Sequence, residues 1–393
     1  MDSGPAPFGA SRNDSGPLYP ATNVNSAIAR ERSIFAGKAE SFWEDLSMNL
    51  TELNKVAQAM VTPGKGILAA DESSGTIKKR FDAIGVESTE DNRRDYREML
   101  FRAKDAMSQH ISGVILYDET IWQTARDGTP LVKLIEESGA IPGIKVDEGT
   151  QALPMCPGEL VTVGLDKLAE RLKKYYERGA RFAKWRAVID IGSGTDGRGI
   201  PSMTAISVNA HALARYATLC QAAQIVPIVE PEVLMDGDHD IDRCYDVTQR
   251  VLNKTFQELR VQRVALEGMV LKPNMAVSGK KCGKQASVAE VAEKTVRLLK
   301  ACVPAAVPGI AFLSGGQSDE EATAHLDAMN RLGPLPWRLT FSYGRALQAA
   351  PQKAWSGKAE NVAAGQRAFA HRARMNALAS RGEWDSGLEK KAA

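Results

Sequence analysis

The chain has 393 residues, with 50 lysines and arginines against 48 aspartates and glutamates and a formal net charge of +2. This near-balance gives no electrostatic basis for nucleic acid or a membrane surface as the main partner, and no apolar run approaches the ~18 residues that cross a bilayer. The five cysteines and five histidines are scattered without metal-ligand spacing, which predicts reduced thiols and no metal site.

Residues 1–48 are expected to form a flexible N-terminal arm, because they are rich in Gly, Pro, Ser and Asn and lack hydrophobic periodicity. They contain no apolar core of the kind that a secretory signal needs. Asp2 and Asp14 also argue against a plastid transit peptide, since such peptides are poor in acidic residues. We therefore expect a cytoplasmic protein; import into a plastid or another organelle is the alternative if residues 1–45 are a cleaved targeting segment.

Eight short apolar or β-branched runs follow from residue 66, and a stretch with helical periodicity separates each from the next. Their starts lie 30 to 47 residues apart, which leaves room for a crossover helix between parallel strands. The pattern predicts a single α/β domain, a (β/α)8 TIM barrel over residues 49–350, with a doubly wound open sheet as the alternative. Residues 351–393 are predicted to form a C-terminal helical tail. The eight runs cover residues 66–71, 113–118, 143–147, 182–189, 226–232, 268–274, 309–316 and 339–345.

Two of the intervening stretches carry clear helix signals. A helix predicted over residues 165–180 places Leu172 and Tyr176 on one apolar stripe. A second helix, predicted over residues 318–332, opens with Ser318 in a capping-box pattern.

Charged side chains gather near the C-terminal ends of the predicted strands, which in a parallel barrel form the rim where active sites lie. Lys184 and Arg186 are two residues apart, as are Glu230 and Glu232, and residues at i and i+2 of a strand share a face. Trp185 suits the helix-facing side, so the charged pairs are expected to point into the barrel. Because isolated charges are costly there, carboxylates and cations should pair. Such a network suggests acid–base chemistry; a purely structural ion cluster is the alternative.

Lys272 ends a strongly apolar run, and Pro273 stops the hydrogen-bond ladder directly after it. An amine in this position, close to a second ammonium such as Lys184, is more readily available in its neutral form. A neutral amine attacks a carbonyl to form a Schiff base, and the resulting iminium is an electron sink for breaking a carbon–carbon bond. The alternative is a lysine that extends along the rim into solvent.

The last two strands predict a phosphate site. Ser314 and Gly315 precede a capped helix whose N-terminus can face an anion, while Gly344 permits close backbone approach and Arg345 supplies a planar donor fork. A second, weaker anion site is expected after the first predicted strand. The alternative is that the same residues form only an ordinary helix cap. It would form from Ser73 and Thr76, with Lys79, Arg80 and Lys145 nearby.

Over roughly residues 50–380 the chain resembles the class I fructose-1,6-bisphosphate aldolase family. The match keeps the order of eight motifs: GKGILAADES, GVILYDET, GIKVD, FAKWR, VPIVEPE, LKPNM, FLSGGQS and FSYGRALQ. The resemblance implies a metal-independent, cofactor-free lyase that reversibly cleaves fructose 1,6-bisphosphate to dihydroxyacetone phosphate and glyceraldehyde 3-phosphate, in glycolysis, gluconeogenesis or the Calvin cycle. It also implies a homotetramer that acts on sugar phosphates, with binding of actin filaments as a possible scaffold role.

The resemblance further implies roles for single residues. Lys272 corresponds to the Schiff-base lysine, Glu230 to the acid–base residue of carbinolamine formation and dehydration, and Asp71 to the base that accepts the C4 hydroxyl proton. The residues that correspond to those tuning Lys272 and orienting substrate are Lys184, Arg186 and Glu232. Those that correspond to the C1-phosphate site are Ser314, Gly315, Gly344 and Arg345, and those toward the C6-phosphate are Ser73, Thr76 and Lys145, with Arg80 at its edge.

One departure from the family pattern concerns a C-terminal tyrosine that is implicated in proton exchange on the enamine. The last tyrosine here is Tyr343, so we expect competent cleavage with enamine protonation that is slow or carried by another group. Three other activities remain as alternatives: another Schiff-base aldolase or a transaldolase, a non-catalytic scaffold using Arg80, Lys145 and Arg186, and a metal-dependent aldolase. Two separate anion sites favour a bisphosphate substrate over those of another Schiff-base aldolase or a transaldolase. A scaffold alone would not need the environment of Lys272, and the sequence offers no ligand cluster for a metal-dependent aldolase.

Overall fold

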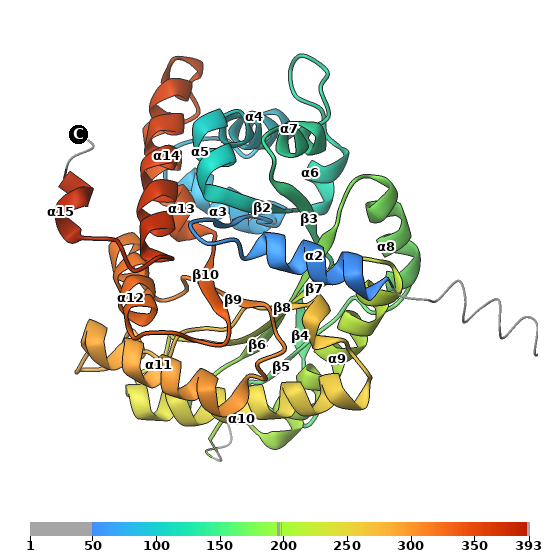
Figure 1. Cartoon of the computed structure of the whole chain (residues 1–393), viewed down its shortest axis with the longest axis vertical. Coiled ribbons are helices and arrows are strands. Elements are labelled where there is room, and N and C mark those ends of the chain that lie inside the picture. The colour runs from blue at the N-terminus through green and yellow to red at the C-terminus, as the bar shows by residue number, and fades with distance from the viewer. Residues whose placement is uncertain (1–48, 195–196, 198, 391–393) are drawn as a thin grey trace, which may run out of the picture. The chain divides into compact units, whose positions relative to one another are not determined.

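The computed structural model describes residues 49–194, 197 and 199–390 and shows a closed barrel of eight parallel strands (Figure 1). The predicted (β/α)8 fold is confirmed; the arm predicted over residues 1–48 lies outside the described residues. Around the barrel the strands follow the order β1, β10, β9, β8, β7, β6, β3, β2. They span β1 (Gly66–Ala70), β2 (Ile111–Leu116), β3 (Ile141–Lys145), β6 (Phe182–Ile189), β7 (Val226–Val233), β8 (Val270–Leu271), β9 (Gly309–Phe312) and β10 (Arg338–Tyr343). An antiparallel pair, β4 (Thr150–Ala152) and β5 (Leu160–Thr162), follows β3.

Two strands are shorter than the sequence predicts. The run over 268–274 pairs only as β8: at its start Gly268 still belongs to a 3-10 turn, and at its end Pro273 has no N–H to donate to the ladder. The run over 309–316 ends as a strand at Phe312, and the chain then turns through Gly316, whose φ is 79°. At both points regular strand pairing stops, and the chain continues as an irregular segment at the rim of the barrel.

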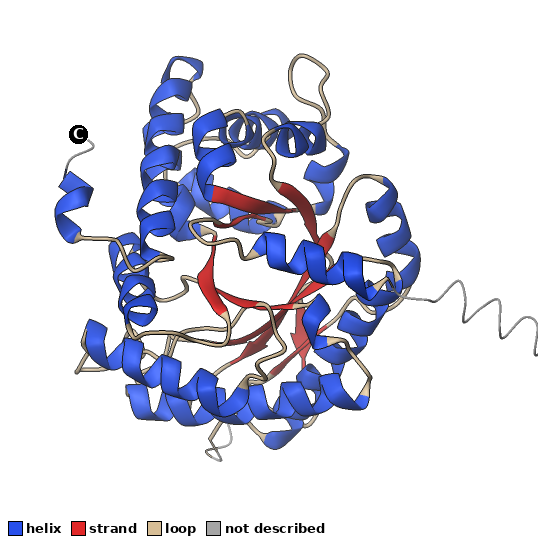
Figure 2. Cartoon of the chain, in the orientation of Figure 1, coloured by secondary structure: helices blue, strands red, loops and turns tan. Residues whose placement is uncertain are grey.

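Helices cover the outside of the barrel and one of its ends (Figure 2). They are α2 (Leu50–Met60), α3 (Ser74–Asp82), α4 (Glu90–Phe101), α5 (Lys104–His110), α6 (Asp118–Trp122), α7 (Leu131–Glu137), α8 (Leu168–Glu177), α9 (Met203–Ala222), α10 (Ile241–Val261), α11 (Val288–Cys302), α12 (Asp319–Arg331), α13 (Arg345–Trp355), α14 (Val362–Ala379) and α15 (Ser386–Glu389), with 3-10 turns at Leu266–Gly268 and Ala359–Asn361. No helix among the described residues is long and apolar enough to cross a bilayer.

The two helices with clear sequence signals form where they are predicted. Ser318 and Glu321 make the reciprocal capping box at the start of α12. In α8, Leu172 is buried as expected, but the buried tyrosine is Tyr175, not Tyr176. The reason is a distant partner, since the Tyr175 hydroxyl donates to Asp118 at 2.7 Å.

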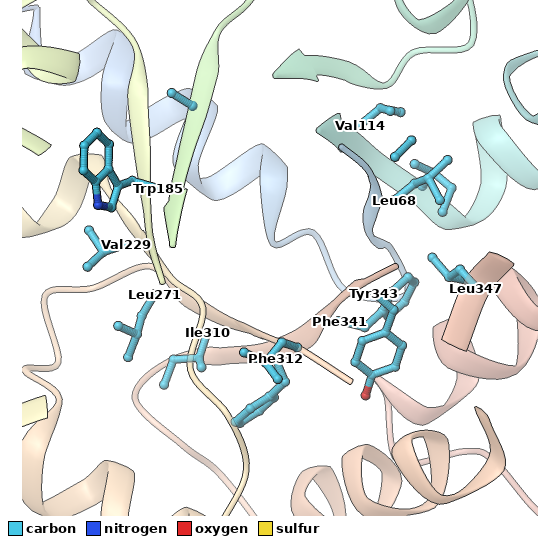
Figure 3. Packing of buried hydrophobic residues seen from close by; sticks show 14 of the residues in the cluster. Leu68, Val114, Trp185, Val229, Leu271, Ile310, Phe312, Phe341, Tyr343 and Leu347 are labelled. Carbon is cyan, nitrogen blue, oxygen red and sulfur yellow. The ribbon is translucent and has the colours of Figure 1, made fainter. Parts of the chain in front are cut away.

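The outward face of the strands packs against the helices. Trp185 is fully buried there and stacks on Tyr216 of α9, with ring centroids 5.6 Å apart, as its helix-facing assignment predicts. Leu68, Val229 and other labelled residues of the strands form the same layer (Figure 3). Because strand side chains alternate between faces, the residues on either side of each of these must point into the barrel.

The interior of the barrel is apolar toward the N-terminal ends of the strands. Phe182 fills it from β6, and a Cβ on Gly113 of the second strand would lie 2.9 Å from its ring, so glycine there makes room for the phenyl group. Apolar side chains of α2 pack on the same cluster and close this end. The cluster contains Leu53, Ala57, Met60, Val61, Ile67, Ala69, Ile115, Phe182, Val226, Ile228, Val270 and Ala311.

The C-terminal helices pack on the outside of the barrel, where α14 contacts α13, α12 and α5. Glu389 of α15 pairs with the buried guanidinium of Arg372 at 2.7 Å and with His371 at 2.9 Å. Arg372 in turn donates to Asp319 O and to Thr323 at the start of α12. The tail is thereby tied to the helix that follows β9.

Candidate active site

The inward positions that are apolar at one end of the barrel carry charges at the other. On β6, Lys184 and Arg186 follow Phe182 at two-residue steps; on β7, Glu230 and Glu232 continue the same face. In the register of the two strands, Arg186 lies opposite Glu230. The sequence prediction that both pairs point inward therefore agrees with their positions.

Lys272 lies directly after β8, and its main-chain N–H still bonds Val229 O at 2.8 Å. Its side chain is 5% exposed, and its ammonium nitrogen lies 3.0 Å from Glu230 Oε1. Asn274, two residues further, accepts from the Val233 N–H at 3.0 Å and ties this segment to the end of β7. The amine and its carboxylate partner are thus held by two neighbouring strands.

Lys184 sits between several carboxylates, and only 4% of its side chain is exposed. Burial alone would lower the pKa of its ammonium group, but the neighbouring carboxylates, Asp71 foremost, raise that pKa well above the usual value. Lys184 therefore stays charged. The carboxylate contacts of Lys184 Nζ are Asp71 Oδ2 at 2.8 Å, Glu230 Oε2 at 3.4 Å and Asp147 Oδ2 at 3.8 Å.

Asp71 follows β1 and is mostly buried. Burial alone would raise the pKa of its carboxyl group, but the charges of Lys184 and Lys272 hold that pKa well below its ordinary value. Asp71 is therefore ionised, which is the form that accepts a proton. Within this cluster, Lys184 has three carboxylates within 4 Å, whereas Glu230 is the one carboxylate that close to Lys272 among the described residues.

Arg186 and Glu232 form the second inward pair, through Nε and Oε2. Burial would lower the pKa of the guanidinium group, and Glu232 more than offsets this, so that pKa lies well above its usual value. Glu232 Oε1 also lies 3.2 Å from the place where a Cβ on Gly315 would be. This pair consequently lies beneath the loop that follows β9.

The predicted phosphate segments meet at the rim. Arg345 begins α13, directly after Gly344, and its Nη2 donates to Gln317 O at 3.0 Å and lies 3.5 Å from Ser314 O. A surface cavity of about 620 Å³ opens here, at the N-terminus of α12. It is lined by Lys280, Gly316, Gln317, Ser318, Asp319, Glu320 and Arg345.

The second predicted anion cluster is only partly assembled. Ser73 caps α3 and its hydroxyl lies 3.1 Å from that of Thr76. Lys145 instead binds Asp147 at 2.7 Å, and within the described part of the chain no hydrogen bond joins it to Ser73 or Thr76.

Arg80 is held by a carboxylate that the sequence did not single out. Its Nη1 lies 2.6 Å from Glu72 Oε1, and the same oxygen accepts from Gln348 at 2.7 Å. A Cβ on Gly344 would lie 3.7 Å from the Arg80 guanidinium, so Arg80 reaches toward the first phosphate segment as well.

Two carboxylates of the site were given no site role from the sequence. Asp147 belongs to the ion network, and its two-residue spacing from Lys145 was an available signal. Glu72 had no such signal, because its partners are Arg80 on α3 and Gln348 on α13, and Gln348 is 276 residues away in the sequence. Among the described residues no group of three or more His, Cys, Asp or Glu is placed to hold a metal ion.

Comparisons with known proteins give a consistent result. The family model described as fructose-bisphosphate aldolase class-I matches residues 52–393. A probable fructose-bisphosphate aldolase class 1 of Xanthomonas campestris is 57% identical over 86% of this chain and 99% of its own length. The cytosolic fructose-bisphosphate aldolase 4 of Arabidopsis thaliana is 54% identical over 84% of this chain and 83% of its own. A solved Plasmodium falciparum fructose-bisphosphate aldolase, in complex with TRAP and a small-molecule inhibitor, has a TM-score of 0.83 and 49% identity, covering 86% of this chain and 96% of that one.

Proposed function

The chain belongs to the class-I fructose-bisphosphate aldolase family of carbon–carbon lyases, and on that premise we propose that Lys272 forms the Schiff base with the ketose. The observation that carries this assignment is the pair of Lys272 Nζ and Glu230 Oε1 at 3.0 Å, at the rim end of a parallel barrel. A carboxylate at this distance can take a proton from the ammonium and leave the amine free to attack. Lys184 is the less suitable nucleophile, because three carboxylates keep it charged.

The steps follow from these positions. The Lys272 amine adds to the C2 carbonyl of fructose 1,6-bisphosphate, and Glu230 supplies the proton with which water leaves the carbinolamine. The iminium withdraws the electron pair of the C3–C4 bond as that bond breaks. This releases glyceraldehyde 3-phosphate and leaves the enamine of dihydroxyacetone phosphate on Lys272. Protonation of the enamine at C3 and hydrolysis of the iminium then free the enzyme.

Asp71 is proposed as the base that accepts the C4 hydroxyl proton during cleavage. It is ionised, and the Lys184 ammonium at 2.8 Å holds it in place. A low carboxyl pKa makes a weak base, so the pair with Lys184 must loosen as the proton arrives. The Arg186–Glu232 pair has a different proposed role, which is to support the ring of charges and orient the substrate from beneath the loop after β9.

The two ends of the substrate are proposed to bind at separate anion sites. Ser314, Gly315, Gly344 and Arg345 would bind the C1-phosphate, and the exposed N-terminus of α12 adds donors to that region. Ser73 and Thr76 at the N-terminus of α3, with Lys145, would bind the C6-phosphate once Lys145 exchanges Asp147 for the ligand. Arg80 lies between the two segments, so its proposed place at the edge of the C6 site extends toward Gly344.

Reductive trapping tests the central assignment. We expect borohydride, added with dihydroxyacetone phosphate, to increase the mass of one peptide, and fragmentation to place the adduct on Lys272. Lys184 provides an internal control because it is equally buried and lies in the same network. An adduct on Lys184, or none on Lys272, would overturn the proposal. Comparing fructose 1-phosphate with the bisphosphate then measures how much the second anion site contributes.

The assembly and the compartment are proposed as well. A homotetramer and a cytoplasmic location follow from the family resemblance, and the cytosolic Arabidopsis relative supports the latter. Light scattering of the purified chain tests the first, and fractionation with mapping of the mature N-terminus tests the second. The division into an arm at 1–48, a catalytic barrel at 49–350 and a tail at 351–393 remains a proposal as well, which limited proteolysis can examine.

An actin-binding scaffold role stays a prediction. The three cations invoked for it each pair with a carboxylate of the same chain: Arg80 with Glu72, Lys145 with Asp147, and Arg186 with Glu232. Any actin binding through them would therefore have to compete with these pairs and with substrate. Cosedimentation with filaments, with and without fructose 1,6-bisphosphate, tests this directly.

A further inference from the structure

Residues 314–317, in the loop between β9 and α12, make few hydrogen bonds with one another that would hold the shape of the loop. A weak turn joins Gln317 N to Ser314 O at 3.4 Å, and Gly316 takes a positive φ of 79°. Beneath it lies the apolar side chain of Met235, which a Cβ on Gly315 or on Gly316 would meet at 2.8 Å. Because a methionine side chain is flexible, packing on Met235 limits how closely the loop approaches it but does not fix the orientation of the loop.

A polar contact from α12 does fix the orientation of the loop. Gln317 is 6% exposed, and its Oε1 lies 2.6 Å from His325 Nδ1. Because an amide oxygen only accepts, Nδ1 of His325 carries the proton and donates. Gln317 Nε2 has no hydrogen-bond partner among the described residues, so His325 alone determines which way this amide points.

His325 is well suited to hold this bond under ordinary conditions. It is 7% exposed on α12, and burial lowers the pKa of its imidazole from 6.5 to about 4, against a smaller opposing effect of Glu321. The ring is therefore neutral near pH 7, with one N–H, and that N–H is committed to Gln317. Protonation of the ring therefore does not disturb this hydrogen bond near pH 7.

The main chain of the same glutamine reaches Arg345. Gln317 O accepts from Arg345 Nη2 at 3.0 Å, and Ser314 O lies 3.5 Å from the same nitrogen. No carboxylate pairs with Arg345 in the part of the chain that the structure describes. The guanidinium is thus oriented by two loop carbonyls and keeps its remaining N–H groups for an anion.

We infer that His325 and Gln317 are positioning residues that hold the 314–317 loop and Arg345 in the geometry that binds the phosphate of the ketose. The inference rests on the proposed assignment of Ser314, Gly315, Gly344 and Arg345 to that phosphate. His325 itself touches no reacting atom; it acts through Gln317. Its loss would leave a buried glutamine without a donor and release the loop, while the chemistry at Lys272 stays intact.

The experiment compares two ligands that differ only in the phosphate. Dihydroxyacetone phosphate and dihydroxyacetone both condense with the amine, and the concentration dependence of borohydride trapping gives an apparent affinity for each. We expect His325→Leu to weaken the affinity for the phosphorylated ligand about tenfold and to leave that for dihydroxyacetone within about twofold. KM for fructose 1,6-bisphosphate should rise, with kcat within about threefold.

Two further variants make the result specific. His325→Asn keeps an N–H near the position of Nδ1 and should restore the parent preference for the phosphorylated ligand. Gln317→Met removes the acceptor at similar size and should reproduce the loss, and it serves in place of His325→Leu if that variant does not fold.

The outcomes separate this inference from the phosphate assignment on which it rests. Arg345→Ala should abolish the preference; if it does not, the assignment of the phosphate site is wrong. If Arg345→Ala abolishes the preference but His325→Leu and Gln317→Met keep it, the positioning role is wrong. Equal weakening of both ligands in His325→Leu would also overturn the inference, because it would indicate a general structural role.

Discussion

The two ends of the barrel interior use the same inward strand positions with opposite chemistry. On β7, Val226 and Ile228 belong to the apolar cluster, and the next two inward residues are Glu230 and Glu232. On β8, Val270 is apolar, and the next inward residue is Lys272. A single two-residue step along each strand thus separates a packed core from a network of buried ions.

This difference indicates a division between the two ends: one stabilises the fold and the other carries the chemistry. Burial of apolar surface at the N-terminal end stabilises the fold, at about 25 cal/mol per Å². Burial of ions at the C-terminal end costs desolvation energy that pairing offsets incompletely, so that end contributes little net stability. What it supplies instead is a charged Lys184, an ionised Asp71 and an amine at Lys272 beside one carboxylate. The division can be tested at each end.

The largest expected effect is a loss of catalysis without a matching loss of stability. Lys272→Met should lower cleavage of fructose 1,6-bisphosphate by at least about 10⁴-fold, because Lys184, the other amine beside Glu230, is kept charged by three carboxylates and cannot replace the lost nucleophile. The thermal midpoint should change little, since Glu230 keeps Lys184 as a partner. Lys254→Met on α10 is the matched control and should keep parent activity. Retained turnover in Lys272→Met would refute the assignment.

Asp71→Asn should separate bond cleavage from Schiff-base formation. We expect cleavage to fall about 10²- to 10⁴-fold, the usual contribution of a general base. Trapping of dihydroxyacetone phosphate on Lys272 should persist, because that step does not involve the C4 hydroxyl. Asp82→Asn, which breaks a surface pair with Lys78, is the control. Parallel loss of trapping and cleavage would mean that Asp71 supports the network instead of acting as the base.

At the other end, Phe182→Ala should affect stability and spare the chemistry. Phe182 is fully buried, and truncation of such a side chain costs about 3–5 kcal/mol of unfolding free energy. Denaturant unfolding measures this, and kcat of the folded enzyme at low temperature should stay within about tenfold of the parent. A collapse of kcat with little loss of stability would show that the two ends are not separable.

How much of this was predictable depends on the range of the interactions. Strand faces, the inward charged pairs and the capping box of Ser318 follow from spacing within a few residues, and the sequence predicts them. The buried tyrosine of α8 was assigned one position too late, because Tyr175 is selected by Asp118 from another element. Glu72 and its hold on Arg80 were missed for the same reason, as was the His325–Gln317 contact, in which a buried histidine in an amphipathic helix gives no sign of its partner.

The smallest expected effect concerns the pH dependence of stability at the rim. The unfolded chain protonates His325 near pH 6.5, whereas burial lowers the pKa in the folded chain to about 4. The unfolded state therefore binds the extra proton first, and the stability that neutral His325 contributes above pH 6.5 is lost as the pH falls toward 4. The full loss amounts to about 3 kcal/mol. His325→Asn removes this titration, so the difference in unfolding free energy between parent and variant should shift by about that amount in favour of the variant from about pH 7.5 to about pH 4. Denaturant unfolding at one protein concentration measures it, and the other histidines cancel because both chains share them. Parallel pH curves for parent and variant would mean that His325 is more accessible to protons than its burial implies.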